Sequence, residues 1–441
     1  MIDNDLFQNI LVKNLHDKKR RILVNRFSDL NTLDTKSYLF LDKYHSNIPE
    51  KFYNEHLFTN FLDTLNNFAL KNDDYIEMLN NFEKEINISF STIEDINALD
   101  FHNKVIQNDK AHMQLLCSQF YNPSYLQLVE SVYSPLIKIL AYISRMNRSA
   151  SIEGLDIFNC SEELKGTNLD IFLKDYRHIV RNGIAHGYIE YNFREVIYTD
   201  KRHKSESLTY DELVELYNDL LDCCNACILA LKLFYLKYIN KVNVPDSMIF
   251  EILKSEVCNP WWDVSKFLVS AREDNKSQLN IFIEVNAIEY LKVYYSSFQT
   301  AILAEQLFPN YDYYFLSFQS NIAYSGYAMF NGKKLKKVKD KNPTNMDDYI
   351  NILQDNMVFY STKIQYPKFI NKLETYWYSG KIHFPMSLHN FHQQIGYLDF
   401  EIKNIKIFRR SFFLIITGDV VFYNVDTLIH KEIQKKNKRT D

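Results

Sequence analysis

Apolar residues recur every three or four positions through most of the first half of the chain, and this spacing predicts helices. Residues 5–30 form a first, rather polar helical segment, and residues 51–85 carry the same period. A third segment over 125–146 keeps the period but contains Pro135, which is predicted to kink or split it because proline has no N–H to donate. The polar stretch 147–167 is predicted to be a loop.

The next stretch predicts a helix, a hairpin and a much longer helix. Residues 167–187 carry a helical stripe that begins at a residue suited to capping and ends at Gly187. Residues 188–191 and 195–198 favour a short hairpin, because they include several β-branched and aromatic residues. A long amphipathic helix then covers about 208–239.

The pattern changes beyond Pro245, where β-forming residues alternate or run together. We expect strands over 278–285, 313–318, 322–330 and 405–422, with helices over 287–308 and 346–355 between them. The predicted fold class is therefore α+β, a mainly α-helical N-terminal half followed by a C-terminal mixed α/β domain of unknown fold. The expected domains are an N-terminal helical region (1–119), a second helical domain (120–242) and the α/β domain (243–441).

Composition describes an ordinary folded protein and gives no overall attraction to nucleic acid, because the net charge is -4. Any contact with RNA must then come from local patches. Aromatic residues reach 15% of the chain. An A/T-rich coding sequence explains them better than a base-stacking surface, for which arginines interleaved with the rings would be expected.

The six cysteines are predicted to be reduced thiols in a cytoplasmic protein, because the sequence has no signal-peptide pattern and no membrane-spanning apolar run. The one CxxC, Cys224 to Cys227, lies in a helical pattern, and no second pair completes a zinc site. We predict that it packs in the core. The sequence indicates no metal site and no cofactor.

The segment Arg181-Asn182-Gly183-Ile184-Ala185-His186-Gly187-Tyr188 carries the most specific chemistry in the chain. An arginine can neutralise the charge of a phosphate, and a histidine can move a proton near neutral pH. Cleavage of an RNA phosphodiester needs these two functions, and RNA supplies its own nucleophile.

A regular helix places Asp175, His178, Asn182 and His186 along one polar stripe, with Arg181 about 140° around the helix from His186. The Arg181 and His186 side chains then do not converge on one phosphate. Either the helix breaks at Gly183, or two copies of the chain face each other so that the arginine of one meets the histidine of the other.

The Arg-Asn-x-x-x-His spacing and its surroundings resemble the signature of the HEPN superfamily, which consists of four-helix-type domains found in prokaryotic toxins, phage-defence nucleases and RNA-processing proteins. The resemblance covers roughly residues 120–242 and says nothing about 243–441. It implies a metal-independent endoribonuclease with its site at a homodimer interface, acting as a toxin or antiviral abortive-infection effector. Arg181 would stabilise the phosphate transition state, His186 would transfer a proton, and Asn182 would orient the site, with His178 and Asp175 as possible supporting residues.

A second likeness concerns Tyr188, which completes the Arg-x-x-x-x-His-x-Tyr pattern of HEPN toxins whose nucleotidyltransferase antitoxin modifies that tyrosine. The resemblance thus implies RNA, a second copy of the chain, and an antitoxin or a phage-derived trigger as partners, with no role for a membrane. The ordinary interpretation of Tyr188, as the first residue of a strand, is favoured over a modification site.

Several weaker features complete the sequence. Lys333, Lys334, Lys336 and Lys337 form a basic run that either contacts RNA or is a solvated hairpin loop, and a second basic run lies in the tail. His383, His389 and His392 have no regular ligand spacing and are read as ordinary histidines. The alternative to a nuclease is a non-catalytic HEPN scaffold that dimerises and binds a partner protein or RNA.

Overall fold

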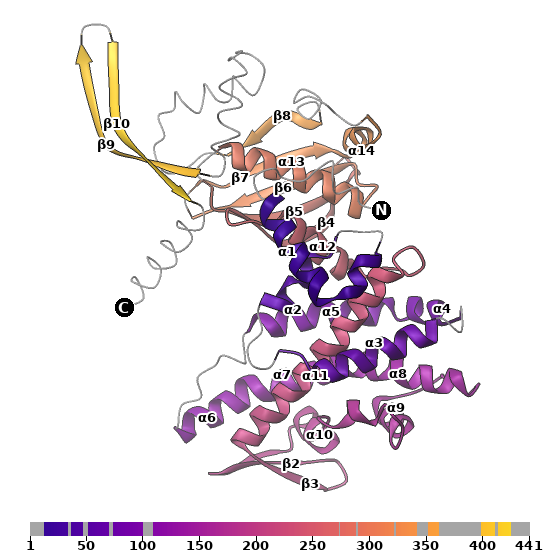
Figure 1. Cartoon of the computed structure of the whole chain (residues 1–441). Helices are drawn as coiled ribbons and strands as arrows, with labels where there is room; N and C mark the ends of the chain where they lie inside the picture. Colours follow the sequence, from indigo (N-terminus) through magenta and orange to yellow (C-terminus); the bar gives the residue numbers. More distant parts are fainter. Residues whose placement is uncertain are drawn as a thin grey trace. The chain divides into compact units, whose positions relative to one another are not determined.

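The computed structural model of the chain describes residues 13–33, 37–46, 52–69, 74–99, 109–272, 274–287, 290–321, 323–341, 352–360, 398–410 and 413–424. They confirm the α+β class, with a helical first half and a sheet-containing second half (Figure 1). The chain forms two compact units, one of which spans Lys19–Ile252 while the other contains Leu253–Asp441 and a short N-terminal segment. The expected boundary between 119 and 120 falls inside a continuous helical run of the first unit.

The helices of the first half, two of which extend past the division between the units, are α1 (Lys13–Arg26), α2 (Lys43–Ser46), α3 (Glu55–Ala69), α4 (Asp74–Asn81), α5 (Glu83–Ala98), α6 (Lys110–Leu116), α7 (Asn122–Leu128), α8 (Ser134–Asn147), α9 (Ile157–Leu164), α10 (His178–His186), α11 (Tyr210–Lys237) and α12 (Asp246–Val257). Short 3-10 turns occupy Ser28–Thr32, Leu39–Asp42 and Asp170–Leu173. A three-stranded antiparallel sheet, β1 (Ile189–Tyr191), β2 (Glu195–Thr199) and β3 (Ser205–Thr209), follows α10.

The long helix α11 is the centre of the first unit. Thr209 and Glu212 cap its first turn reciprocally: the Glu212 N–H donates to the Thr209 hydroxyl, and the Thr209 N–H donates to the Glu212 carboxylate. From Leu220 to Leu236 every residue of α11 is buried, and the helix packs along α3. A helix buried on all sides is a core helix, and it holds Cys224 and Cys227 as buried free thiols, as predicted.

Two prolines lie within a continuous helical run that includes α6, α7 and α8. Each follows a π-helical turn, Cys117–Tyr121 before Pro123 and Val129–Tyr133 before Pro135. The wider turn accommodates a proline ring, and the helical run continues through Pro135, so the expected split into separate helices is wrong. Pro135 has no N–H to donate to the Ser131 carbonyl, and this carbonyl instead accepts a hydrogen bond from the Ser89 hydroxyl at 2.8 Å.

The run Ala111–Asn147 is long and apolar enough to cross a membrane by length and composition alone. However, 61% of its most apolar window is buried inside the protein, as in the core helix of many soluble proteins.

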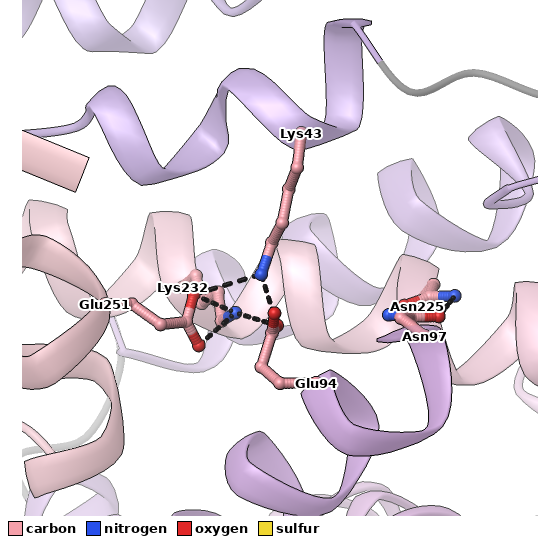
Figure 2. Close-up of polar contacts among 6 residues, drawn as sticks. All are labelled: Lys43, Glu94, Asn97, Asn225, Lys232 and Glu251. Atoms are coloured by element: carbon pink, nitrogen blue, oxygen red, sulfur yellow. Dashed lines mark hydrogen bonds and ion pairs between the residues drawn. The ribbon is translucent and has the colours of Figure 1, made fainter. Parts of the chain in front are cut away.

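A buried charge cluster joins four helices of this unit (Figure 2). The Lys232 side chain is 0% exposed, and its Nζ lies 2.7 Å from Glu251 Oε2 and 3.1 Å from Glu94 Oε1. Lys43 pairs with the same two carboxylates. Beside the cluster, Asn97 and Asn225 exchange two amide hydrogen bonds of 2.8 and 3.1 Å. Two lysines and two glutamates make the cluster neutral as a whole, and each lysine lies beside both carboxylates.

The second unit contains a five-stranded sheet in the order β4 (Trp262–Ala271), β5 (Ser277–Val285), β6 (Tyr313–Gln319), β7 (Gly326–Asn331) and β8 (Leu353–Phe359). β5 and β6 are parallel and joined by α13 (Tyr290–Leu307), whereas the other neighbours are antiparallel. α13 packs on one sheet face, where the rings of Phe298 and Phe330 lie 5.2 Å apart. α14 (Gly332–Lys341) follows β7, and β9 (Leu398–Arg410) pairs with β10 (Phe413–Asn424) as an antiparallel hairpin.

Several expected elements differ from the structure. Helix α9, capped by Asp156, lies within the expected loop 147–167, and β3 adds an unexpected strand. The helix expected over 346–355 is wrong at its end, where residues from Leu353 belong to strand β8, and its earlier part lies outside the described residues. The lysine-rich segment after Gly332 is a helix rather than a hairpin loop.

Candidate functional site

The helix that carries Arg181 and His186 is shorter than predicted. Arg177 has an extended backbone with φ -113° and ψ 103°, so α10 begins only at His178. The Arg177 N–H donates instead to the Tyr125 hydroxyl at 3.0 Å, a partner from α7. The single helix expected over 167–187 is therefore wrong, and Asp175 lies before α10 rather than on the same stripe as His186.

The end of α10 follows the prediction, and its hydrogen bonds explain the glycine. Gly187 has a positive φ of 72°, which glycine adopts without a steric penalty. The Tyr188 N–H donates to the Gly183 carbonyl at 2.9 Å and the Gly187 N–H to the Ile184 carbonyl at 3.2 Å, a Schellman arrangement. The Tyr188 carbonyl then accepts from Thr199 at 3.0 Å, which joins the helix end to strand β2.

Gly183 allows α10 to lie directly against β2. A Cβ atom at this position would be 2.9 Å from the Tyr198 Cβ and 3.2 Å from the Thr199 backbone nitrogen. Neither neighbour is the end of a flexible side chain, so a larger residue would push the helix away. Gly183 thus serves packing, and the helix continues through it without a break.

A polar row runs along one side of α10. The Asn182 amide lies 3.0 Å from His178 Nε2, and Arg181 Nη1 donates to Asn182 Oδ1 at 2.7 Å. Arg181 Nε donates to the Glu130 carboxylate at 2.5 Å, and its Nη2 pairs with the same oxygen. Glu130 comes from the π-helical turn before α8. Arg181, Asn182 and His178 are therefore brought together, with the arginine charge facing a carboxylate.

His186 lies one turn beyond Asn182 on the stripe that carries His178 and Asn182, but on a different side of the helix from Arg181. Its side chain is exposed, and its ring centroid is 6.5 Å from that of Tyr188, which is 55% exposed. Because α10 is continuous, the five-residue step from Arg181 to His186 corresponds to about 140° around its axis. A break at Gly183, the first of the two expected arrangements, is therefore wrong, and one chain does not direct both side chains at one phosphate.

A basic turn follows β2, and the sequence analysis does not include it among the candidate contacts. Its signal is four consecutive basic residues. Lys201, Arg202, His203 and Lys204 are all exposed in the turn between β2 and β3. Asp200 shapes the turn by accepting the Arg202 and Lys204 backbone N–H groups at 2.8 and 2.9 Å. These bonds, first that from Lys204, lower the pKa of Asp200, and the charge of His178 adds to the effect. The turn follows directly after β2, the strand against which α10 packs through Gly183.

The other expected contacts lie elsewhere in the chain. Lys333, Lys334, Lys336 and Lys337 are exposed on α14 of the second unit, while Leu335 between them is buried. The three histidines 383, 389 and 392 and the basic tail fall outside the described residues. Within the described part of the chain, no three His, Cys, Asp or Glu side chains gather in a way that could hold a metal ion.

Comparison with known proteins adds no relative, since no family model, curated protein or solved structure matches this chain. The functional interpretation therefore depends on the chemistry of α10 and its surroundings.

Proposed function

We propose that the chain is a HEPN-type, metal-independent endoribonuclease that acts as a toxin or an anti-phage effector. The observation that carries the proposal is α10 itself, where an Arg-Asn-x-x-x-His sequence ends a helix with its histidine exposed. Arg181 neutralises the phosphate in the transition state, while His186 exchanges a proton with the 2′-hydroxyl or the 5′-oxygen. The products are a 2′,3′-cyclic phosphate and a 5′-hydroxyl.

The same proposal gives the neighbouring groups supporting roles. Asn182 holds Arg181 through the 2.7 Å hydrogen bond, and His178 in turn contacts Asn182. The exposed Tyr188 next to His186 is accessible to a modifying antitoxin, and a nucleotide attached there would block the histidine.

A second copy of the chain completes the site in this proposal. Arg181 and His186 point away from each other by about 140° on one helix, so the partner's copy must supply the missing group. Two large apolar side chains are exposed in one chain, as an interface would require: Phe158 (48%), whose ring lies 5.8 Å from that of His178, and Phe193 (69%) between β1 and β2.

The first experiment is RNA cleavage in EDTA by the purified protein and its His186→Ala variant, with analysis of the new ends. We expect cyclic-phosphate ends from the wild type and none from the variant. Cleavage that persists in an Arg181→Ala, His186→Ala double variant would refute the proposal.

Mixing two inactive variants tests the shared site directly. Arg181→Ala and His186→Ala chains each lack one group, but a mixed dimer contains one Arg181 and one His186 on opposite chains. If the site is shared, unfolding and refolding the two variants together restores part of the activity. If each site lies within one chain, the mixture stays inactive, because no chain carries both residues.

A non-catalytic dimeric scaffold is the alternative, and the Glu130 contact favours it. Arg181 already has a carboxylate partner, which lowers its attraction for phosphate. A scaffold predicts a stable dimer whose partner binding is unaffected by His186→Ala and which cleaves no RNA under any condition.

A further inference from the structure

The five-stranded sheet of the second unit has one face that α13 does not cover. Along β5, Leu279, Ile281 and Ile283 are buried, while the residues between them point to the opposite face and include Phe282 and Glu284. The parallel register of β5 and β6 and the antiparallel register of β6 and β7 carry this alternation across the sheet.

Three aromatic rings form a row across neighbouring strands on this open face. Phe315 of β6 stacks on Tyr327 of β7 with a centroid distance of 5.7 Å and an interplanar angle of 17°. Tyr327 stacks on Phe359 of β8 at 5.8 Å and 25°. Tyr327 is 38% exposed and Phe359 is 42% exposed, far more than rings packed in a core. The row therefore offers flat apolar surface to solvent.

Cations lie over the rings of the same face. The Arg272 guanidinium is 4.6 Å from the centroid of Tyr313, and its Nη1 contacts the Met329 sulfur at 3.1 Å. Lys276 lies 5.5 Å from the same Tyr313 centroid. Lys266 lies 5.0 Å from the centroid of Phe282 in β5.

Acidic groups of the same face lie at both ends of the strands. Asp274 pairs with both Arg272 and Lys276 beside Tyr313. Glu284 of β5 and its register partner Asp263 of β4 are exposed at the opposite ends of these strands, where Asp263 lies 3.6 Å from Lys254. Beside Tyr313, two cations thus face one carboxylate.

We infer that this face binds single-stranded RNA. Stacked rings accept bases because every base has a flat π-surface, and nearby arginine and lysine neutralise the phosphates between them. A base pair in a duplex keeps both of its surfaces stacked, so the rings favour a single strand. The choice of RNA over DNA rests on the proposed function, whereas the stacking surface itself is independent of it.

This placement explains why the sequence did not reveal the surface. The rings come from three strands, and Arg272 reaches Tyr313 across the sheet rather than along the chain. The alternation of rings and cations that is expected of a stacking surface therefore arises only in the folded sheet, and not along the sequence.

The test uses the full chain with His186→Ala, so that RNA is bound without cleavage. The probe is a fluorescein-labelled, unstructured single-stranded RNA, followed by fluorescence anisotropy. We expect Tyr327→Ser with Phe359→Ser to weaken binding at least roughly tenfold. Both residues are exposed, so the protein stays folded, and circular dichroism checks this. The matched controls Tyr327→Phe and Phe359→Tyr keep the rings and should bind within about twofold of the parent.

Several outcomes would overturn the inference. Unchanged affinity in the serine variant would do so, as would equal affinity for duplex RNA, since stacking would then not be the mode of binding. Loss of binding on neutralising Lys333, Lys334, Lys336 and Lys337, with none in the serine variant, would move the contact to α14. Equal affinity for a DNA strand of the same sequence would overturn the assignment to RNA. Because binding is measured in the absence of cleavage, a failed nuclease assay would not decide whether this face binds RNA.

Discussion

Replacing Lys232 by Met removes one of the two cations from the buried charge cluster and leaves two carboxylates facing Lys43 alone. The Lys232 side chain is 0% exposed and lies 2.7 Å from Glu251. Met has nearly the same length, so the substitution changes the charge much more than the packing. One negative charge then stays uncompensated in the interior of the helical unit.

The expected cost follows from the burial of each partner. Removing one partner of a buried pair costs about 3–5 kcal/mol, because the other charge remains buried. The Glu94 side chain is 32% exposed, so water screens part of the imbalance and the lower value, about 3 kcal/mol, applies. For a unit of this size, each kcal/mol lowers the melting temperature by about 2–4 °C, which gives a fall of about 6–12 °C.

The assay separates the two units by their signals. All three tryptophans, Trp261, Trp262 and Trp377, follow Ile252 and so report the second unit. Far-ultraviolet circular dichroism is dominated by the helices of the first. Lys232→Met should lower the melting temperature seen by circular dichroism far more than that seen by tryptophan fluorescence. Lys237→Met, an exposed lysine on the same helix, is the control and should change stability by less than about 0.5 kcal/mol.

A double variant decides whether charge balance is the cause. Lys232→Met with Glu251→Gln leaves one cation and one anion, Lys43 and Glu94, and should recover about half of the lost stability. Equal melting of Lys232→Met and Lys237→Met would refute the reasoning, because the cluster would then be hydrated. A double variant less stable than Lys232→Met would refute the charge-balance argument.

Three further predictions follow from other contacts. Gly183→Ala gains about 1 kcal/mol of helix propensity but places its Cβ 2.9 Å from the Tyr198 Cβ. We therefore expect the free energy of unfolding, measured in urea, to fall by about 1–2 kcal/mol. A rise would mean that α10 can move away from β2. Glu130→Gln removes the charge that faces Arg181 and should tighten RNA binding by up to about fivefold in anisotropy, whereas weaker binding would mean that Glu130 positions the arginine. Burial alone would raise the pKa of Glu94, but the charges of Lys232 and Lys43 outweigh burial and lower this pKa to about 2. The ionised Glu94 therefore stabilises the fold fully above pH 4.5, and this stabilisation is lost as the pH falls towards 2. Thermal melts across this range should show the loss for the wild type, and Glu94→Gln should reduce it.

Much of the fold was predictable because its signals are local. The helical period fixed α11 to within a few residues, and Gly187 marked the end of α10 because glycine readily takes the left-handed conformation found there. Strands β5 and β6 were evident from their β-forming residues, and the short hairpin after Gly187 was placed within a residue at most bounds. Each of these signals acts within one or two turns of chain.

The features that only the tertiary structure decided involve partners far apart in the sequence. Arg177 leaves the helix because its N–H meets the Tyr125 hydroxyl, and the charge of Arg181 meets Glu130, each more than a helix length away along the chain. The sequence by itself determined the residue types of the candidate site, an arginine and a histidine on one helix. The structure decided that they point apart, because a continuous α10 fixes the angle between them.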